Sequence, residues 1–166
     1  MRKLFLTLAG AAAVLTGMTV SVYAAPPETA AVPAETAAAP KKAVWLENYS
    51  EALKLAEKEK KPVLVNFTGS DWCIWCIRLH DQVLSQPAFQ NYAAGNLILL
   101  KVDFPRKSSQ TAAQRKANNA LSEKYGVRGF PTILLLNSDG AVIGKTGYRR
   151  GGAEAYVKHL QQLLKK

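Results

Sequence analysis

FTGSDWCIWC, residues 67–76, contains both cysteines of the chain, Cys73 and Cys76. A β-branched apolar run precedes this segment, and a stretch with helical character, residues 77–84, follows it. A cysteine at the start of a helix meets unpaired backbone N–H groups and the positive end of the helix dipole, which favour the thiolate. The second cysteine lies about one turn later, within disulfide range. The spacing predicts that Cys73 is the accessible, attacking thiol and that Cys76 is the buried, resolving thiol.

Other uses of a Cys-x-x-Cys pair fit the sequence less well. Zinc clusters usually bring a second pair of ligands, and only His80 lies near enough in the sequence to join the two cysteines. Haem attachment needs a histidine directly after the second cysteine, where this chain has Ile77. A structural bridge over so short a loop removes little unfolded-chain entropy. Redox chemistry without a cofactor is favoured, and a metal-binding or metal-chaperone module using Cys73, Cys76 and His80 is the alternative.

The N-terminus has the pattern of an export signal. Basic residues at positions 2 and 3 precede an apolar run over residues 4–20, and small or apolar side chains stand at Val22 and Ala24. This pattern predicts a signal peptide over residues 1–24, cleavage before Ala25, and a periplasmic or secreted protein. The alternative is an uncleaved anchor that tethers the protein to the membrane, because the apolar run approaches the length of a span.

Composition divides the remainder into a linker and one domain. Residues 25–43 consist almost entirely of Ala, Pro, Glu and Thr, which predicts a disordered linker. Residues 44–166 have the length of a single domain with its own core. The net charge is +10, but the basic residues are scattered and form no nucleic-acid motif. We therefore expect no nucleic-acid partner, and a basic surface that favours acidic partners or anionic lipid heads.

Hydrophobic periodicity predicts alternating helices and strands along this domain. The predicted helices are 45–61, 77–84, 87–94, 109–125 and 153–164, and the predicted strands are 62–67, 97–102, 132–136 and 141–146. Residues 137–140 read Asn-Ser-Asp-Gly, a strong hairpin turn between the last two strands. This order predicts an α/β fold with a central mixed β-sheet and helices on both faces.

Three motifs together resemble the thioredoxin-fold thiol–disulfide oxidoreductases. They are the segment 67–76, the segment YGVRGFPT at 125–132, and Asp139-Gly140. The similarity covers residues 44–166 and is greatest to exported bacterial members with a GSDWCxWC active site. It implies a thioredoxin fold, protein disulfides as substrates, a membrane electron-transfer protein as donor, and no organic cofactor. An independent isomerase is less expected than a reductase, because no separate dimerisation domain is present, and an oxidase would need a more strongly stabilised thiolate than Ile74-Trp75 provides. We expect a monomer.

The resemblance also assigns roles to particular residues. It implies an attacking thiol, a resolving thiol, aromatic contacts beside them, and a backbone that pairs with an extended substrate; the residues are Cys73, Cys76, Trp72, Trp75, Phe130 and Pro131. Pro131 matches the proline that thioredoxins hold in cis, facing the sulfurs. For Trp75, the sequence favours a substrate contact and a packing role equally.

Asn66 is a departure from the family pattern. Thioredoxins usually bury an aspartate on the strand before the active site, and Asn66 matches that position if one extra residue before Cys73 is allowed. A carboxylate can take a proton from the resolving thiol, whereas an amide can only form hydrogen bonds. Proton removal from Cys76 would then need water or another group.

The sequence thus favours an exported enzyme that reduces protein disulfides by dithiol exchange through Cys73 and Cys76. A non-catalytic domain that keeps the fold to dock partners is a second alternative, and it would tolerate the change Cys73→Ser.

We predict that the mature protein begins at Ala25, because the junction after Ala24 has the residues that a signal peptidase reads. Intact-mass measurement and fractionation of the producing cells check this. A full-length, membrane-bound product would contradict it and would give the segment 25–43 the role of a spacer.

Overall fold

The computed structural model describes residues 42–165 of the protein. The predicted signal peptide 1–24, nearly all of the predicted linker 25–43, and Lys166 lie outside the described residues. The boundaries of these segments therefore stay predictions.

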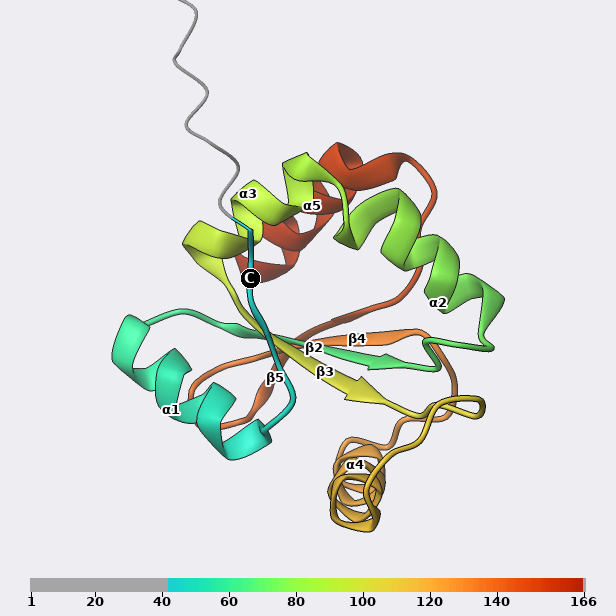
Figure 1. The fold of residues 1–166 in the computed structure, drawn as a ribbon. Coiled ribbons are helices and arrows are strands. Elements are labelled where there is room, and N and C mark those ends of the chain that lie inside the picture. Colours follow the sequence, from blue (N-terminus) through green and yellow to red (C-terminus); the bar gives the residue numbers. More distant parts are fainter. Residues whose placement is uncertain (1–41, 166) are drawn as a thin grey trace, which may run out of the picture. The chain divides into compact units, whose positions relative to one another are not determined.

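A five-stranded mixed sheet forms the centre of the described domain (Figure 1). Its strands are β1 (Trp45–Leu46), β2 (Val63–Thr68), β3 (Ile98–Asp103), β4 (Thr132–Leu136) and β5 (Val142–Thr146), and they lie in the order β1-β3-β2-β4-β5. The β1–β3 and β2–β3 pairs are parallel, whereas the β2–β4 and β4–β5 pairs are antiparallel. The predicted mixed sheet is confirmed.

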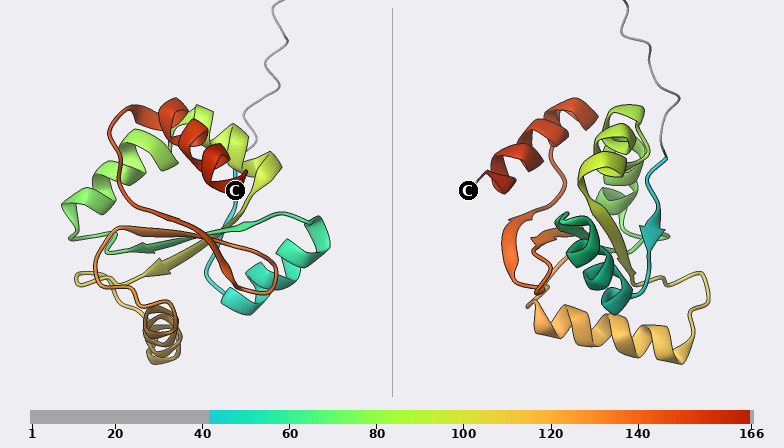
Figure 2. Two further views of the ribbon diagram at one scale, coloured as in Figure 1. Left: turned by 180° about the vertical axis from the view of Figure 1, so that it is seen from behind. Right: turned by 90° about the vertical axis from the view of Figure 1, so that its left-hand side faces the viewer.

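Helices cover both faces of this sheet, as the sequence predicts (Figures 1 and 2). They are α1 (Tyr49–Glu59), α2 (Ile74–Leu79), the π-helical turn η1 (His80–Leu84), α3 (Pro87–Asn96), α4 (Ala112–Lys124) and α5 (Gly152–Leu164). One core packs α2, η1, α3 and α5 against the sheet through residues such as Leu79, Phe89 and Tyr156. The other core packs α1 and α4 on the opposite face through Ala52 and Leu121.

The N-terminal end of the domain differs from the prediction. Residues 45 and 46, predicted to begin a helix, instead form β1 and pair with Leu99 and Leu100 of β3. The helix α1 begins at Tyr49, because the Asn48 Oδ1 accepts the N–H of Glu51 at 3.0 Å and caps it. Two residues are too few to show the alternating pattern of a strand. The helical spacing of the residues that follow therefore placed the start of the predicted helix too early.

Helix ends elsewhere are set by specific caps. The crossover helix α4 begins at Ala112, three residues later than predicted, because the Thr111 Oγ1 accepts the N–H of Gln114 at 3.1 Å. After α2 the hydrogen bonds span five residues instead of four: in η1 the Ser85 N–H donates to the carbonyl of His80 at 2.9 Å. The predicted hairpin turn is present, with Gly140 at φ 79°.

The strand β2 determines where the cysteines lie. It is the middle strand of the sheet, and all six of its residues are buried. Buried on both faces, it reads as a near-continuous apolar run. Its carboxyl end leads directly into the segment with Cys73 and Cys76. In the part of the chain that the structure describes, no helix is long and apolar enough to cross a membrane.

Candidate active site

The turn from β2 into α2 places Cys73 at the N-cap of the helix, directly before its first residue, Ile74. The N–H groups of Trp72 and Cys73 both donate to the carbonyl of Gly69, at 3.3 and 2.9 Å. Cys73 is the N-cap residue of α2, and its Sγ accepts the N–H of Cys76 at 3.3 Å. The sulfur thus takes the place that a serine or aspartate oxygen usually has at a helix N-terminus.

The two sulfurs have different surroundings. Both are free thiols, and the exposed fractions of the two residues are 7% for Cys73 and 4% for Cys76. Cys73 is therefore less exposed than predicted, and the Phe130 carbonyl oxygen lies 3.7 Å from its Sγ. Burial raises the pKa of Cys76 to about 11; the hydrogen bond with Cys73 adds to this effect, and the N–H of Gly69 opposes it. The Cys76 thiol is therefore protonated near neutral pH.

The segment around Phe130 and Pro131 faces Cys73 from the start of β4. The Phe130–Pro131 peptide bond is cis, the isomer that the family resemblance implies. A β-carbon on Gly147 would lie 3.0 Å from the carbonyl oxygen of Pro131, a tight contact that glycine avoids where the loop after β5 approaches this segment. Within residues 42–165, the backbone N–H of Phe130 has no hydrogen-bond partner.

Trp72 is fixed on three sides. Its Nε1 donates to the carbonyl of Phe104 at 2.8 Å, and its ring meets that of Phe130 edge-on, with centroids 6.0 Å apart. A β-carbon on Gly69 would come within 2.5 Å of the indole, so the glycine makes room for it. The guanidinium carbon of Arg106 lies 3.7 Å from the centroid of the indole ring, a cation–π contact.

Two carboxylates attach the loop after β3 to the turn before Cys73. The Asp71 side chain accepts the backbone N–H groups of residues 106–108 at 2.7–3.0 Å. These bonds, that of Arg106 first among them, lower the pKa of Asp71 to about 2. Asp103 accepts both the N–H and the hydroxyl of Ser70, at 3.0 and 2.5 Å. The position of Arg106 over the indole therefore depends on Asp71.

Trp75 lies on the exposed side of α2. It is 43% exposed, and its ring packs against that of Tyr148, with centroids 5.4 Å apart. The guanidinium carbon of Arg78 lies 4.8 Å from the centroid of the Trp75 ring. The neighbouring Ile74 is 55% exposed. The exposed side chains of Trp75 and Ile74, close to Cys73 in the sequence, form a surface available to a bound polypeptide.

Asn66 is buried on the face of the sheet that carries the thiols. The side chains of β2 alternate, so Asn66 shares its face with Leu64, which packs in the core under α2, and with Thr68, which contributes a hydrogen bond to Cys76. Asn66 is 8% exposed, and its Oδ1 has no hydrogen-bond partner within residues 42–165. A buried, unpaired carbonyl oxygen is costly, and native structures contain few of them.

No group of three or more His, Cys, Asp or Glu side chains in residues 42–165 is arranged to hold a metal ion. His80 is exposed at the start of η1, and no such group joins it to the two cysteines. The described residues therefore lend no support to the metal-binding alternative.

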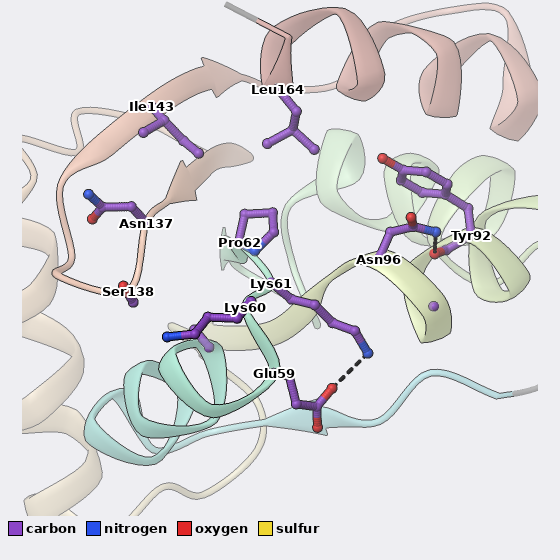
Figure 3. A pocket seen from close by; sticks show the side chains of 12 residues that line it. Glu59, Lys60, Lys61, Pro62, Tyr92, Asn96, Asn137, Ser138, Ile143 and Leu164 are labelled. Carbon is purple, nitrogen blue, oxygen red and sulfur yellow. Dashed lines mark hydrogen bonds and ion pairs between the residues drawn. The ribbon is translucent and has the colours of Figure 1, made fainter.

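Figure 3 shows a hollow of about 730 Å³ whose lining does not include either cysteine. Its lining includes Lys60, Pro62, Tyr92 and Asn137. Pro62 precedes the amino end of β2, whereas Cys73 follows the carboxyl end, so roughly 20 Å of strand separates the two places. The hollow is therefore not part of the thiol site.

Sequence reasoning missed several residues of this site. These are two carboxylates that fix the turn before Cys73 and three side chains that contact the aromatic residues of the site: Asp71, Asp103, Phe104, Arg106 and Tyr148. The position of Asp71 directly before Trp72 is the one signal that could have drawn attention to it. The others reach the site from distant parts of the chain and carry no local signature.

Residues 49–164 match the family model of the thioredoxin-like domain. The chain belongs to the thioredoxin-like family. It is 40% identical over 119 residues to the disulfide bond reductase DsbH of Chlamydia pneumoniae, covering 72% of each protein. It is also 28% identical over 130 residues to the thioredoxin-related protein DsbJ of the same organism, where the match covers 74% of this chain and 37% of DsbJ.

Solved structures of the family agree with the fold. A structure of the DsbH oxidoreductase is 38% identical and matches with a TM-score of 0.72, over 75% of this chain and 85% of that one. The oxidised C-terminal domain of DsbD from Neisseria meningitidis matches with a TM-score of 0.52 at 21% identity, over 72% and 98% of the two chains. The thioredoxin fold and the family predicted from residues 67–76 and 125–132 are confirmed.

We predict that alkylation of the reduced protein at pH 7 modifies Cys73 first. A thiol with a pKa of about 11, such as Cys76, is ionised in only about one molecule in ten thousand at that pH, and the thiolate is the reactive form. Brief treatment with iodoacetamide followed by peptide mass spectrometry measures the order. Preferential labelling of Cys76 would reverse the two roles.

Asn66→Asp is expected to speed breakdown of the Cys73 mixed disulfide, by about threefold or more, because a carboxylate can accept the proton of Cys76. The same change should lower the free energy of unfolding by about 1–3 kcal/mol, since a buried charge is poorly solvated. Stopped-flow reduction of a model disulfide separates resolution from attack, and thermal melts report stability. If neither resolution nor stability changes, Asn66 does not occupy the position of the family's buried acid.

Asp71→Asn is expected to destabilise the protein near neutral pH. The lowered pKa of Asp71 means that its contribution is complete above the unfolded value of about 4 and is lost as the pH falls toward 2. Denaturant unfolding of both proteins between pH 2 and pH 6 measures this. The difference between them should be constant above about pH 5 and should shrink below pH 4, and a difference that does not vary with pH would show that Asp71 acts without its charge.

Proposed function

We propose that the protein is an exported thiol–disulfide oxidoreductase that reduces protein disulfides. The observation that carries this proposal is the asymmetry of the thiol pair. Cys73 lies at a helix N-terminus, where its sulfur accepts a backbone N–H, while burial raises the pKa of Cys76 and keeps that thiol protonated before the resolution step. The name of DsbH, disulfide bond reductase, supports the reducing direction for this relative of 40% identity.

The exchange proceeds in two balanced steps. The Cys73 thiolate attacks one sulfur of a substrate disulfide; an S–S bond to Cys73 forms as the substrate bond breaks, and the departing substrate thiolate takes up a proton. Cys76 then loses its proton and attacks the Cys73 sulfur, which releases the second substrate thiol and leaves a Cys73–Cys76 disulfide. The substrate gains two electrons and two protons, and the protein dithiol is oxidised.

Substrate binding rests on the groups around Cys73. The unpaired N–H of Phe130 supports pairing with the backbone of an extended segment, as in strand addition. Trp72 and Phe130 form an aromatic wall on one side, and Trp75 with Tyr148 forms a second aromatic surface. Trp75 therefore serves as a substrate contact, since its ring is exposed.

Repeated turnover of an exported reductase needs a source of electrons, because the compartments outside the cytoplasm are oxidising. We assign this role to a membrane-embedded dithiol protein. The match of 118 residues at 30% identity to the thiol:disulfide interchange protein DsbD of Pectobacterium atrosepticum supports an interchange partner of this class, although the chain spans 18% of that protein. The protein acts as a monomer in the periplasm or the external medium.

The decisive experiment traps substrates in cells with the variant Cys76→Ala. This variant completes the first step but cannot release the product, so Cys73 should accumulate mixed disulfides that a reducing agent dissolves. The double variant Cys73→Ala/Cys76→Ala is the control and should trap nothing. Mass spectrometry of the trapped species identifies the substrates, and their absence would favour a non-catalytic docking domain.

The direction of the reaction is tested by the redox state of the wild-type protein in growing cells. Acid quenching followed by alkylation should find most of it as the dithiol, the form that a reductase needs. A protein found mainly as the disulfide would act instead as an oxidase.

A further inference from the structure

A polar hollow of about 430 Å³ is lined by residues of α4 and of the loop that precedes it. It lies beside the aromatic wall formed by Trp72 and Phe130. Phe104, one of its lining residues, stacks on Phe130 with ring centroids 5.0 Å apart, and the Phe130 carbonyl lies 3.7 Å from the Cys73 sulfur. Arg106, another lining residue, lies over the Trp72 ring. The hollow is thus linked to the attacking thiol by two contacts, the stacking of Phe104 on Phe130 and the approach of the Phe130 carbonyl to the Cys73 sulfur.

The lining of this hollow is positively charged. It contains the side chains of Arg106 and Arg115 together with Ser108, Ser109 and Gln110, and it contains no carboxylate. Neither arginine forms a salt bridge within residues 42–165. The Arg115 guanidinium donates to the carbonyl of Gln110 at 3.4 Å and has further donors to offer.

The nearest carboxylates are already engaged with the protein. Asp71 accepts three backbone N–H groups from residues 106–108, and Asp103 accepts the N–H and hydroxyl of Ser70. Both offset part of the local positive charge. Neither reaches the two guanidinium groups as an ion pair, so these groups keep their capacity for an external carboxylate.

A third arginine, Arg78, lies on α2, the helix that Cys73 caps. Arg78 rests against the Trp75 ring, so each tryptophan that flanks Cys73 in the sequence carries a guanidinium group. Asp81, one turn further along the helix, makes no salt bridge with Arg78 in the described part of the chain. The surface around Cys73 therefore offers aromatic rings for apolar contact and arginines for negative charge.

We propose that this enzyme selects polypeptide disulfides flanked by aspartate or glutamate, and that the hollow lined by Arg106 and Arg115 receives one of these acidic side chains. The proposal rests on the disulfide reductase function proposed above and names its substrate class. A guanidinium matches a carboxylate in shape and charge, and complementary charge speeds encounter as well as fixing register. Asp71 has a positioning role, because it holds the backbone of Arg106.

The test compares three synthetic peptides that each contain one internal disulfide and differ only in the flanking residues, which are glutamate, glutamine or lysine. Second-order rate constants for their reduction by the reduced full-length protein are measured by stopped flow. The glutamate peptide should react about three to ten times faster than the glutamine peptide, as expected from one or two exposed ion pairs. The lysine peptide should be the slowest, and about 0.5 M NaCl should compress the differences.

The double variant Arg106→Gln/Arg115→Gln should bring the glutamate-to-glutamine rate ratio close to one. The matched control is Lys54→Gln/Lys116→Gln, which removes the same charge from exposed positions outside the hollow. It should retain the wild-type ratio. Because each ratio is measured within one protein, a general change of activity or stability cancels.

Three results would overturn the proposal. First, the wild type could reduce the glutamate and glutamine peptides at equal rates. Second, the Arg106→Gln/Arg115→Gln variant could keep the wild-type rate ratio. Third, the Lys54→Gln/Lys116→Gln variant could lose the preference for the glutamate peptide to the same extent, which would show an effect of net charge alone. If the wild type reduces none of the peptides, the proposed reductase function itself fails and the selectivity fails with it. That outcome is recognised separately, because the Cys73–Cys76 dithiol then remains unoxidised.

Discussion

The burial of β2 in the middle of the sheet is the constraint on which the site depends. A strand with neighbours on both edges and helices on both faces cannot shift its register without exposing its apolar side chains. Its carboxyl end is therefore fixed, and the hydrogen bonds from Trp72 and Cys73 to Gly69 turn the chain from this end into a helix. The positions of both sulfurs follow from this turn, because Cys73 caps the helix and Cys76 lies within its first turn.

Around this fixed turn, the remaining parts of the site are held by polar contacts in addition to the packing of Phe104 and Phe130 against the core. Asp71 and Asp103 connect the turn to the loop after β3, and that loop brings Phe104 and Arg106 to the indole of Trp72. Such contacts at a surface contribute less to stability than the buried strands do. They determine instead which groups surround the attacking sulfur, and so which polypeptides can approach it.

The sequence was sufficient for the parts of the molecule that are encoded locally. The Cys-x-x-Cys helix, the apolar strands, the hairpin at 137–140 and the family were all predictable, since each has a pattern within a few residues. The strand at 45–46 was not predictable, because it forms by long-range pairing with β3 and two residues carry no recognisable strand pattern. For the same reason, the contacts of Arg106 with Trp72 and of Tyr148 with Trp75 were found only in the structure. The sequence identified Asn66 as a departure from the family, but its unpaired oxygen depends on every neighbour in the fold.

The amide at position 66 has a consequence for how the domain responds to the acidity of its surroundings. A buried carboxylate takes up a proton somewhere in the range of habitable pH, and the interior then changes its charge, whereas an amide has no proton to gain or lose there. The interior of the sheet at this position therefore stays electrically neutral whether the medium is acidic or alkaline. The packing beneath the two sulfurs therefore does not change through ionisation at this position as the pH changes.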